Sequence, residues 1–173
     1  MKSILRKEIL EARKRIVDKE LRDYIICTWL KNLIEDYDKI MIYYPISNEP
    51  NLLDIMDNSN KSFYLPFSKD NNLEIRKIVN LNDLEEDEEH VPSSKIKSDD
   101  SMEVVIVPAI AMNKQFYRLG YGKGYYDRFL KNKNVLKIAV VYHEFLIDDQ
   151  YQDEWDVQFD YIVTDLKVIK KEK

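Results

Sequence analysis

All three glycines of this 173-residue chain stand in one short stretch, at positions 120, 122 and 124. The same stretch holds two cations, Arg118 and Lys123, together with three tyrosines and Asp127. Glycine lets a backbone approach a ligand closely, so free backbone N–H groups and two cations can face one ligand. Such a loop is suited to a polyphosphate or another anion. A tight turn that carries a solvated lysine is the simpler alternative.

The spacing of these glycines excludes two common phosphate-binding motifs. Lys123 is followed by glycine rather than by the serine or threonine of a P-loop. The glycines alternate with other residues, whereas the dinucleotide fingerprint has the spacing G-x-G-x-x-G. The residues therefore predict an anion-binding loop and leave the reaction open.

Short apolar runs rich in β-branched residues predict the strands that position this loop. They cover residues 40–44, 63–65, 104–107, 138–142 and 161–164, and the first three stop at a proline. Such runs are typical of strands buried on both faces of a parallel sheet, and proline indicates a strand end. Helical patterns occur at residues 52–56 and 125–130. We expect an α/β fold with an open, mostly parallel sheet flanked by helices.

Further elements are expected around this sheet. The spacing of apolar residues predicts two N-terminal helices, one over residues 3–17 and a second capped by Asp18. Residues 73–78 predict an antiparallel strand at an edge of the sheet. The acidic run at 83–89 predicts a solvated, mobile loop, and the basic tail at 167–173 predicts a frayed end. We expect one domain over residues 1–173.

Two polar loops should meet at one edge of the sheet. Ligands of open α/β sheets bind beyond the carboxyl ends of the strands. The glycine loop follows the strand that ends at Pro108, and the segment from Tyr44 to Glu49 follows another strand. Their convergence predicts a single crevice.

Composition restricts the partners and the location. A net charge of −5 and a pI near 5.2 argue against a nucleic-acid binder, and no apolar run approaches membrane-spanning length. The lone cysteine, Cys27, favours a buried structural thiol. His90 and His143 have no nearby Cys/His cluster, so we expect no transition-metal site. With no visible signal peptide, the expected protein is cytoplasmic, acts on small molecules, and is a monomer or homodimer.

Residues 118–130 have the sequence RLGYGKGYYDRFL and follow the segment VIVPAIAM at 105–112. This combination resembles the signature of the 5-formyltetrahydrofolate cyclo-ligases, also called 5,10-methenyltetrahydrofolate synthetases. Three weaker segments extend the resemblance in order over nearly the whole chain: Lys2-x-x-Leu5-Arg6, Tyr44-Pro45-x-x-x-Glu49, and the stretch from Asp160 to Thr164.

The resemblance implies an ATP-dependent ring closure, with Mg²⁺ accompanying the nucleotide. In that family the formyl oxygen of 5-formyltetrahydrofolate takes the γ-phosphoryl group of ATP, N10 attacks the activated carbon, and phosphate leaves. Lys123 and Arg118 match catalytic positions, since fixed cations stabilise a transferring phosphoryl group. The implied ATP-binding residues are Lys2, Ser3, Ile4, Leu5, Arg6, Arg118, Leu119, Gly120, Tyr121, Gly122, Lys123, Gly124, Tyr125 and Tyr126.

The same resemblance implies a folate subsite and a magnesium site. The substrate-binding positions are Arg6, Tyr44, Glu49, Tyr121, Gly122, Lys123, Gly124 and Tyr125. A carboxylate such as Glu49 accepts hydrogen bonds from the amino and ring N–H groups of a pterin. Asp127 and Asp160 match the metal positions, and hard carboxylate oxygens suit Mg²⁺.

Three segments depart from the family pattern. Glu89-His90-Val91-Pro92 lacks a glycine, Phe145 replaces a glutamine, and Trp155-Asp156 replaces a His-Asp pair. These changes concern the substrate side more than the ATP loop. Two alternatives therefore stay open: a nucleotide- or folate-binding protein that has lost catalysis, and an α/β sugar-phosphate isomerase or transferase that needs no ATP.

Overall fold

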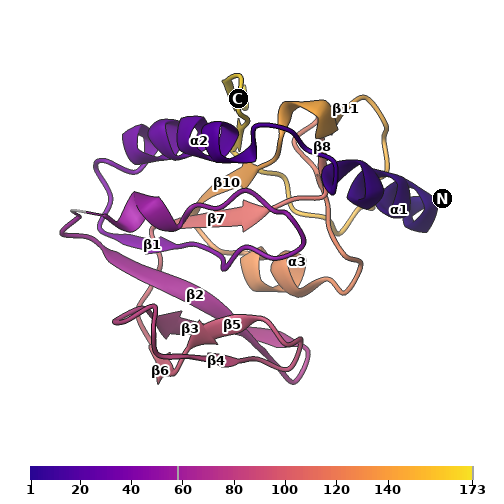
Figure 1. Ribbon diagram of the computed structural model, residues 1–173. Coiled ribbons are helices and arrows are strands. Elements are labelled where there is room, and N and C mark those ends of the chain that lie inside the picture. The colour runs from indigo at the N-terminus through magenta and orange to yellow at the C-terminus, as the bar shows by residue number, and fades with distance from the viewer. Residues whose placement is uncertain (58, 173) are drawn as a thin grey trace.

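In the computed structural model, which describes residues 1–57 and 59–172, eight strands form one large sheet (Figure 1). Their order across the sheet is β13 (Val168–Lys170), β12 (Tyr161–Val163), β10 (Leu136–Val140), β7 (Val104–Pro108), β1 (Lys39–Met41), β2 (Ser62–Lys69), β3 (Asn72–Lys77) and β6 (Ile96–Lys97). The strands from β12 to β2 pair in parallel, and β13, β3 and β6 are antiparallel. The predicted mostly parallel sheet with an antiparallel edge is confirmed; the strand predicted at 73–78 is β3, and β6 lies outside it.

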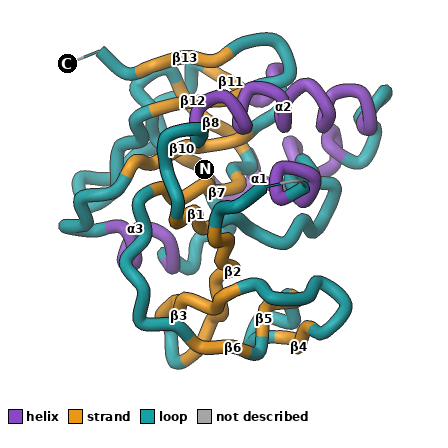
Figure 2. Tube along the Cα trace, turned by 90° about the vertical axis from the view of Figure 1, so that its left-hand side faces the viewer, coloured by secondary structure: helices purple, strands orange, loops and turns teal. Residues whose placement is uncertain are grey.

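Helices cover both faces of this sheet, as predicted (Figure 2). Helices α1 (Lys2–Arg13) and α2 (Lys19–Leu33) lie on one side, and α3 (Tyr125–Leu130) lies on the other. All five residues of the central strand β7 are buried because the sheet is covered on both faces. The segment at 52–56 forms a 3₁₀ helix, η1 (Leu53–Met56), rather than an α-helix.

Two smaller sheets position loops near the carboxyl ends of the parallel strands. Strands β8 (Ala111–Asn113) and β9 (Arg118–Leu119) form a hairpin, with β11 (Leu146–Ile147) beside β8 after the 3₁₀ helix η2 (His143–Phe145). The glycine loop therefore runs directly from β9 to α3. Strands β4 (Leu84–Glu86) and β5 (Pro92–Ser94) form a second hairpin.

Pro66 does not end its strand, contrary to the prediction. Strand β2 continues to Lys69 and pairs with β3 through Pro66 and beyond. Its pairing with β1 stops at Tyr64. Past that point β2 has a partner on one side only, so a residue without an N–H group can stand in the strand.

The prediction of a loop at 83–89 was wrong, although Asp83, Glu85, Glu86 and Glu88 are exposed to solvent as predicted. The segment forms β4 and the turn of the β4–β5 hairpin, and Asp87 at this turn is buried. The carboxylate of Asp87 accepts hydrogen bonds from the backbone N–H groups of Ser68, Glu89 and Val91 at 2.9–3.0 Å. These bonds fix the turn, which an acidic composition alone does not reveal.

Other local expectations had mixed outcomes. Asp18 occupies the N-cap position of α2, but its side chain makes no capping hydrogen bond and its φ is 55°. Cys27 is buried, and burial raises the pKa of its thiol to about 12, which fits a structural role. The tail forms β13 instead of fraying; Lys173 lies outside the described residues. No helix within 1–57 and 59–172 is both long enough and apolar enough to cross a bilayer.

Candidate active site

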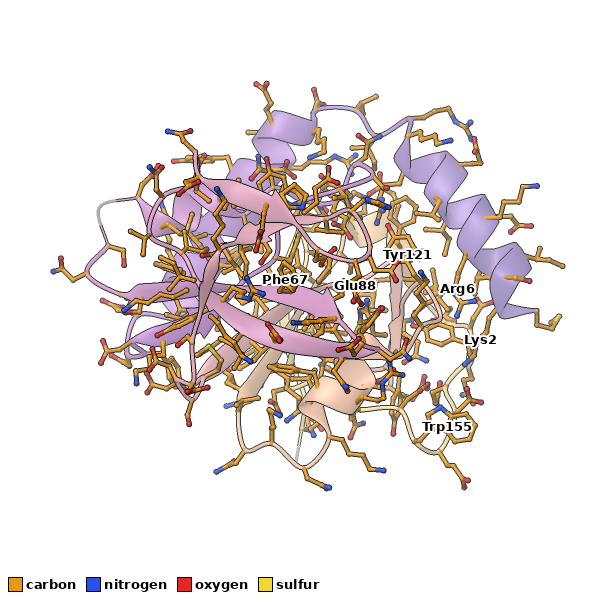
Figure 3. All side chains as sticks on the ribbon, turned by 90° about the horizontal axis from the view of Figure 1, so that it is seen from below. Lys2, Arg6, Phe67, Glu88, Tyr121 and Trp155 are labelled. Carbon is orange, nitrogen blue, oxygen red and sulfur yellow. The ribbon has the colours of Figure 1, made fainter. Side chains whose placement is uncertain are left out.

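A cavity of about 390 Å³ lies where the glycine loop meets the segment that follows β1. The predicted convergence of these two loops is therefore present. Further parts of its wall come from the start of α1, the β2–β3 pair, the end of β7, the β4–β5 hairpin, and a turn at residues 153–156. In Figure 3, Tyr121, Arg6 and Lys2 follow one another along the α1 side of the molecule, with Trp155 beyond Lys2.

Each of the three glycines lies against the guanidinium group of an arginine. A Cβ atom on Gly120 would lie 2.5 Å from Nη1 of Arg118. Gly122 faces Arg6 in the same way, and Gly124 faces Arg128. Gly122 and Gly124 also have φ values of 97° and 72°, which favour glycine. The glycines therefore bring the loop backbone close to three cations.

Helix α1 contributes one cationic face to the cavity. Lys2 and Arg6 are four residues apart, and both line the cavity. Nε of Arg6 donates to the carbonyl of Gly120 at 2.5 Å, and Nζ of Lys2 lies 2.6 Å from Asp153. Further along, Arg13 is 1% exposed and links the two loops: Nε donates to the Ser47 carbonyl and Nη2 to the Tyr121 hydroxyl. Helix α1 therefore fixes both loops of the site.

Arg118 lies beneath the glycine loop. Its Nε donates to the carbonyl of Pro108 at 2.6 Å, and its guanidinium stands 4.9 Å from the ring centroid of Tyr126. Burial lowers the pKa of Arg118 from its ordinary value, while the carboxylates of Asp127 and Glu49 act in the opposite direction. Arginine keeps its charge in such surroundings. It therefore presents a fixed cation to the cavity.

Lys123 extends from the glycine loop to the β4–β5 hairpin. Its Nζ lies 2.5 Å from Oε2 of Glu89, and the hydroxyl of Tyr125 donates to Oε1 of the same carboxylate at 3.0 Å. The hydrogen bond from Lys123 is the largest cause that lowers the pKa of Glu89. The Lys123 side chain is 58% exposed. Its ammonium group can therefore exchange Glu89 for an anionic ligand without unfolding the loop.

Glu49 lies on the opposite wall and is 4% exposed. Ser47 and Asn48, both with positive φ, form a turn in which Glu49 Oε1 accepts the N–H of Ile46 at 2.9 Å. Burial raises the pKa of the Glu49 carboxyl to about 7. The Ile46 hydrogen bond and the charge of Arg13 oppose this rise only in part. This carboxyl can therefore accept or donate a hydrogen bond near neutral pH.

The raised pKa of Glu49 should make stability depend on pH. Between the ordinary value of 4.5 and the folded value of about 7, the folded state holds a proton that the unfolded state has lost. The free energy of unfolding should therefore fall as pH rises through this window. Glutamine does not titrate. As pH rises across this window, the free energy of unfolding of the wild type, relative to that of Glu49→Gln, should fall by roughly 3 kcal/mol, at about 1.4 kcal/mol per pH unit. Urea unfolding of both proteins across the window measures this difference, and parallel pH profiles would contradict it.

Carboxylates gather at the start of α3. Asp127 lies in the first turn of α3, and its Oδ1 accepts the N–H of Val157 at 3.2 Å. Burial, followed by the nearby charge of Asp156, raises the pKa of Asp127. Asp153 and Asp156 line the same part of the cavity. A divalent cation between these carboxylates and a polyphosphate would remove their repulsion.

The structure does not bring Asp160 to this cluster. Asp160 precedes β12, where its carboxylate accepts the N–H of Lys137 at the beginning of β10. That position is at the amino ends of the parallel strands, whereas the cavity lies at their carboxyl ends. We therefore replace Asp160 by Asp156 in the candidate metal site.

Most of the predicted site residues line the cavity together. They are Lys2, Arg6, Tyr44, Glu49, Arg118, Leu119, Gly120, Tyr121, Gly122, Lys123, Gly124, Tyr125, Tyr126 and Asp127. Ser3, Ile4 and Leu5 do not: Ser3 and Ile4 are exposed on α1, and Leu5 packs against the core. These three are left out of the candidate site. What the lining residues bind stays a prediction.

Several lining or supporting residues were missed from the sequence. Asp87 and Glu89 were assigned to a mobile loop, and Arg13 was treated only as part of a helix. Of the segments that depart from the family pattern, Trp155 and Asp156 line the cavity, whereas Phe145 is buried in the core. Arg13 stands seven residues after Arg6, two turns along the same helix face, and this spacing was the available signal for Arg13.

His143, Glu144 and Asp165 form a second group of potential metal ligands. Nδ1 of His143 lies 2.8 Å from Asp165, and Arg22 contacts Glu144 at 2.6 Å and Asp165 at 3.6 Å. The guanidinium of Arg22 already neutralises these carboxylates. We therefore interpret the group as an ion-pair network that joins α2 to the ends of β10 and β12.

The comparisons with known proteins agree with one another. The sequence profile described as the 5-formyltetrahydrofolate cyclo-ligase family matches residues 1–165. The chain is 31% identical to a 5-formyltetrahydrofolate cyclo-ligase of Mycoplasma pneumoniae, covering 95% of this chain and 98% of that protein. It is similar in structure to a 5,10-methenyltetrahydrofolate synthetase of Aquifex aeolicus, with a TM-score of 0.84, 29% identity, and coverage of 98% and 92% of the two chains. A synthetase structure from Mycoplasma pneumoniae gives a TM-score of 0.74 at 27% identity, covering 95% and 98%.

Proposed function

The chain belongs to the 5-formyltetrahydrofolate cyclo-ligase family, and we propose that the cavity between the glycine loop and Glu49 is its active site. The protein is a ligase that cyclises 5-formyltetrahydrofolate to 5,10-methenyltetrahydrofolate at the expense of ATP. One observation carries the assignment of the site: Arg6, Arg118 and Lys123 surround a glycine loop that faces a buried carboxyl in the same cavity. This arrangement suits a polyphosphate at one end and a pterin at the other.

The phosphates of ATP are placed on the glycine loop. Backbone N–H groups of the loop, the guanidinium of Arg6 and the ammonium of Lys123 form a cationic cradle. Binding of the γ-phosphate would draw Lys123 away from Glu89. Positive groups held around a transferring phosphoryl group stabilise the charge that its transition state spreads over the oxygens.

The pterin is placed against the segment that follows β1. Glu49 offers a partner for the amino and ring N–H groups of the pterin, and the rings of Tyr44 and Tyr125 line the same space. Because the Glu49 carboxyl has a pKa of about 7, it can pair with ring atoms that donate or that accept a hydrogen bond. The formyl oxygen would then face the γ-phosphate, as phosphoryl transfer between two bound substrates requires.

Magnesium is proposed at Asp127 and Asp156. Burial and the nearby charge of Asp156 raise the pKa of Asp127, so a cation beside these carboxylates would stabilise their ionised forms. The cavity lining also carries acidic side chains at Glu89 and Asp153, which disfavour an unaccompanied polyphosphate. A bound Mg²⁺ would neutralise phosphate oxygens.

The order of bond changes follows from this placement. The formyl oxygen attacks the γ-phosphorus, its bond to phosphorus forms, and ADP leaves. N10 of the folate then attacks the activated formyl carbon and loses its proton to solvent, the carbon–oxygen bond breaks, and phosphate departs with that oxygen. Arg118 and Lys123 stabilise the phosphoryl group before and after its transfer.

Substitution of the metal-binding candidates should change the magnesium requirement. Asp127→Asn and Asp156→Asn should each raise the Mg²⁺ concentration for half-maximal activity by about tenfold or more, because each removes one anionic ligand. Asp160→Asn is the matched control, since Asp160 lies outside the cavity and should leave this concentration nearly unchanged. Magnesium titrations of initial rate at saturating folate measure the effect. A larger shift in Asp160→Asn than in Asp156→Asn would reverse the assignment.

The proposed site is tested by following methenyl product in the near-ultraviolet with Mg-ATP and 5-formyltetrahydrofolate. Product should require ATP and should be lost when residues of the glycine loop are replaced. ATP-dependent product that is insensitive to the glycine loop and to Glu49 would place the active site elsewhere. A non-catalytic binder or an isomerase would form no ATP-dependent product at all.

A further inference from the structure

Trp155 is a large aromatic side chain that is 62% exposed although it lines the cavity. Figure 3 shows it at the edge of the molecule beyond Lys2. An indole that is mostly exposed and also lines a binding cavity offers a flat face to a ligand. Such a face favours contact with a planar ligand ring.

The backbone that carries Trp155 is fixed in place. The N–H of Asp153 donates to Oδ2 of Asp156 at 2.9 Å, and the N–H of Asp156 returns to the carbonyl of Asp153 at 3.1 Å. The turn is tied to α1 by the 2.6 Å contact between Lys2 and Asp153. It is tied to α3 by the hydrogen bond from Val157 to Asp127. Trp155 is therefore held between the phosphate-binding and metal-binding candidates.

We propose that Trp155 is the stacking platform for the adenine ring of ATP, an inference that rests on the proposed function of the cavity. With the phosphates on the glycine loop and the metal at Asp127 and Asp156, the nucleoside extends toward the turn at residues 153–156. The indole receives the base at the mouth of the cavity.

The charges around Trp155 favour adenine over the other aromatic ligand of the reaction. The residues next to Trp155 in the sequence are acidic: Asp153, Glu154 and Asp156. Within the described residues, only Asp153 has a cationic partner, which is Lys2. The glutamate tail of a folate is anionic and would be repelled by these acids. Adenine is neutral, and its amino group can donate to a carboxylate. The acidic turn therefore favours the neutral adenine ring over the anionic glutamate tail of a folate.

The test uses tryptophan emission as a direct reporter. The chain has two tryptophans, and Trp29 lies in α2 outside the cavity, so Trp29→Phe leaves Trp155 as the single indole. Mg-ATP should quench this emission, whereas magnesium tripolyphosphate, which has no base, should bind without quenching it. Calorimetry should show that Trp155→Ala weakens Mg-ATP binding about tenfold, within the range of a base–aromatic stack. Binding of tripolyphosphate should be unchanged, and Trp155→Phe should restore most of the affinity.

Other outcomes overturn the proposal. Equal losses of affinity for Mg-ATP and tripolyphosphate would make Trp155 a support for the phosphate site. Unchanged affinity for Mg-ATP, or quenching by 5-formyltetrahydrofolate alone, would remove adenine from this position. Because these binding measurements need no turnover, they separate the two claims. Base-dependent quenching in a protein that forms no methenyl product would support the adenine subsite and contradict the proposed function.

Discussion

Replacement of Lys123 by alanine is expected to lower kcat for ATP-dependent ring closure by about 100- to 1,000-fold, the usual cost of removing one group that stabilises transition-state charge. Lys123 is the exposed cation of the glycine loop. Its ammonium group pairs with Glu89, and the side chain is 58% exposed. The substitution therefore removes a charge from the cavity without removing packing from the core. Steady-state rates at saturating ATP and folate measure the effect.

A neighbouring lysine provides the control for this prediction. Lys131 is exposed at the end of α3 and does not line the cavity. Lys131→Ala changes the net charge by the same amount and should keep nearly full activity. Equal losses in the two variants would indicate a general effect of charge on binding. A wild-type kcat in Lys123→Ala would exclude Lys123 from phosphoryl transfer.

The second large effect is expected when the guanidinium of Arg118 is displaced. Arg118→Lys keeps the charge but loses the planar group that contacts Pro108 and Tyr126, so kcat should fall by about 100-fold. Gly120→Ala should cause a similar fall, because a Cβ atom would lie 2.5 Å from Nη1 of Arg118. Gly120 does not have a positive φ, so alanine creates no backbone strain there.

A double-mutant cycle tests whether both substitutions act through the same guanidinium. If they do, the enzyme that carries both substitutions should be about as active as the less active of the two single variants. Multiplied losses would indicate that Gly120 contributes separately, for example through its backbone N–H. Circular dichroism and thermal unfolding of each variant show whether the fold is retained.

The sequence predicted the parts of the fold that depend on local patterns. Continuous apolar runs identified the parallel strands, and the spacing around Tyr125 identified α3. Pro66 was misassigned because the rule that proline ends a strand fails where a strand has one open side. The acidic run at 83–89 was misassigned because Asp87 is stabilised by three backbone N–H groups, of which Ser68 is 19 residues away.

The site was predictable where its residues lie in one segment and less so where distant segments meet. The glycine loop was recognisable because its glycines, cations and tyrosines stand together. The contact of Lys2 with Asp153 joins residues 151 positions apart, and that of Lys123 with Glu89 joins residues 34 apart. Asp160 was chosen over Asp156 from a family resemblance, and the sequence does not reveal that the Asp160 carboxylate accepts the N–H of Lys137, away from the cavity. Tertiary packing, which local patterns do not encode, decides these pairings.

The central claim is that this cavity couples transfer of the γ-phosphoryl group to the formyl oxygen with closure of the folate ring. The most direct measurement follows the oxygen atom itself. 5-Formyltetrahydrofolate labelled with heavy oxygen in the formyl group is converted with unlabelled Mg-ATP in unlabelled water, and the released phosphate is analysed by mass spectrometry. Each phosphate released with methenyl product should carry one labelled oxygen. Unlabelled phosphate, with the heavy oxygen released to water, would show that ATP is hydrolysed without activation of the formyl group and would contradict the central claim.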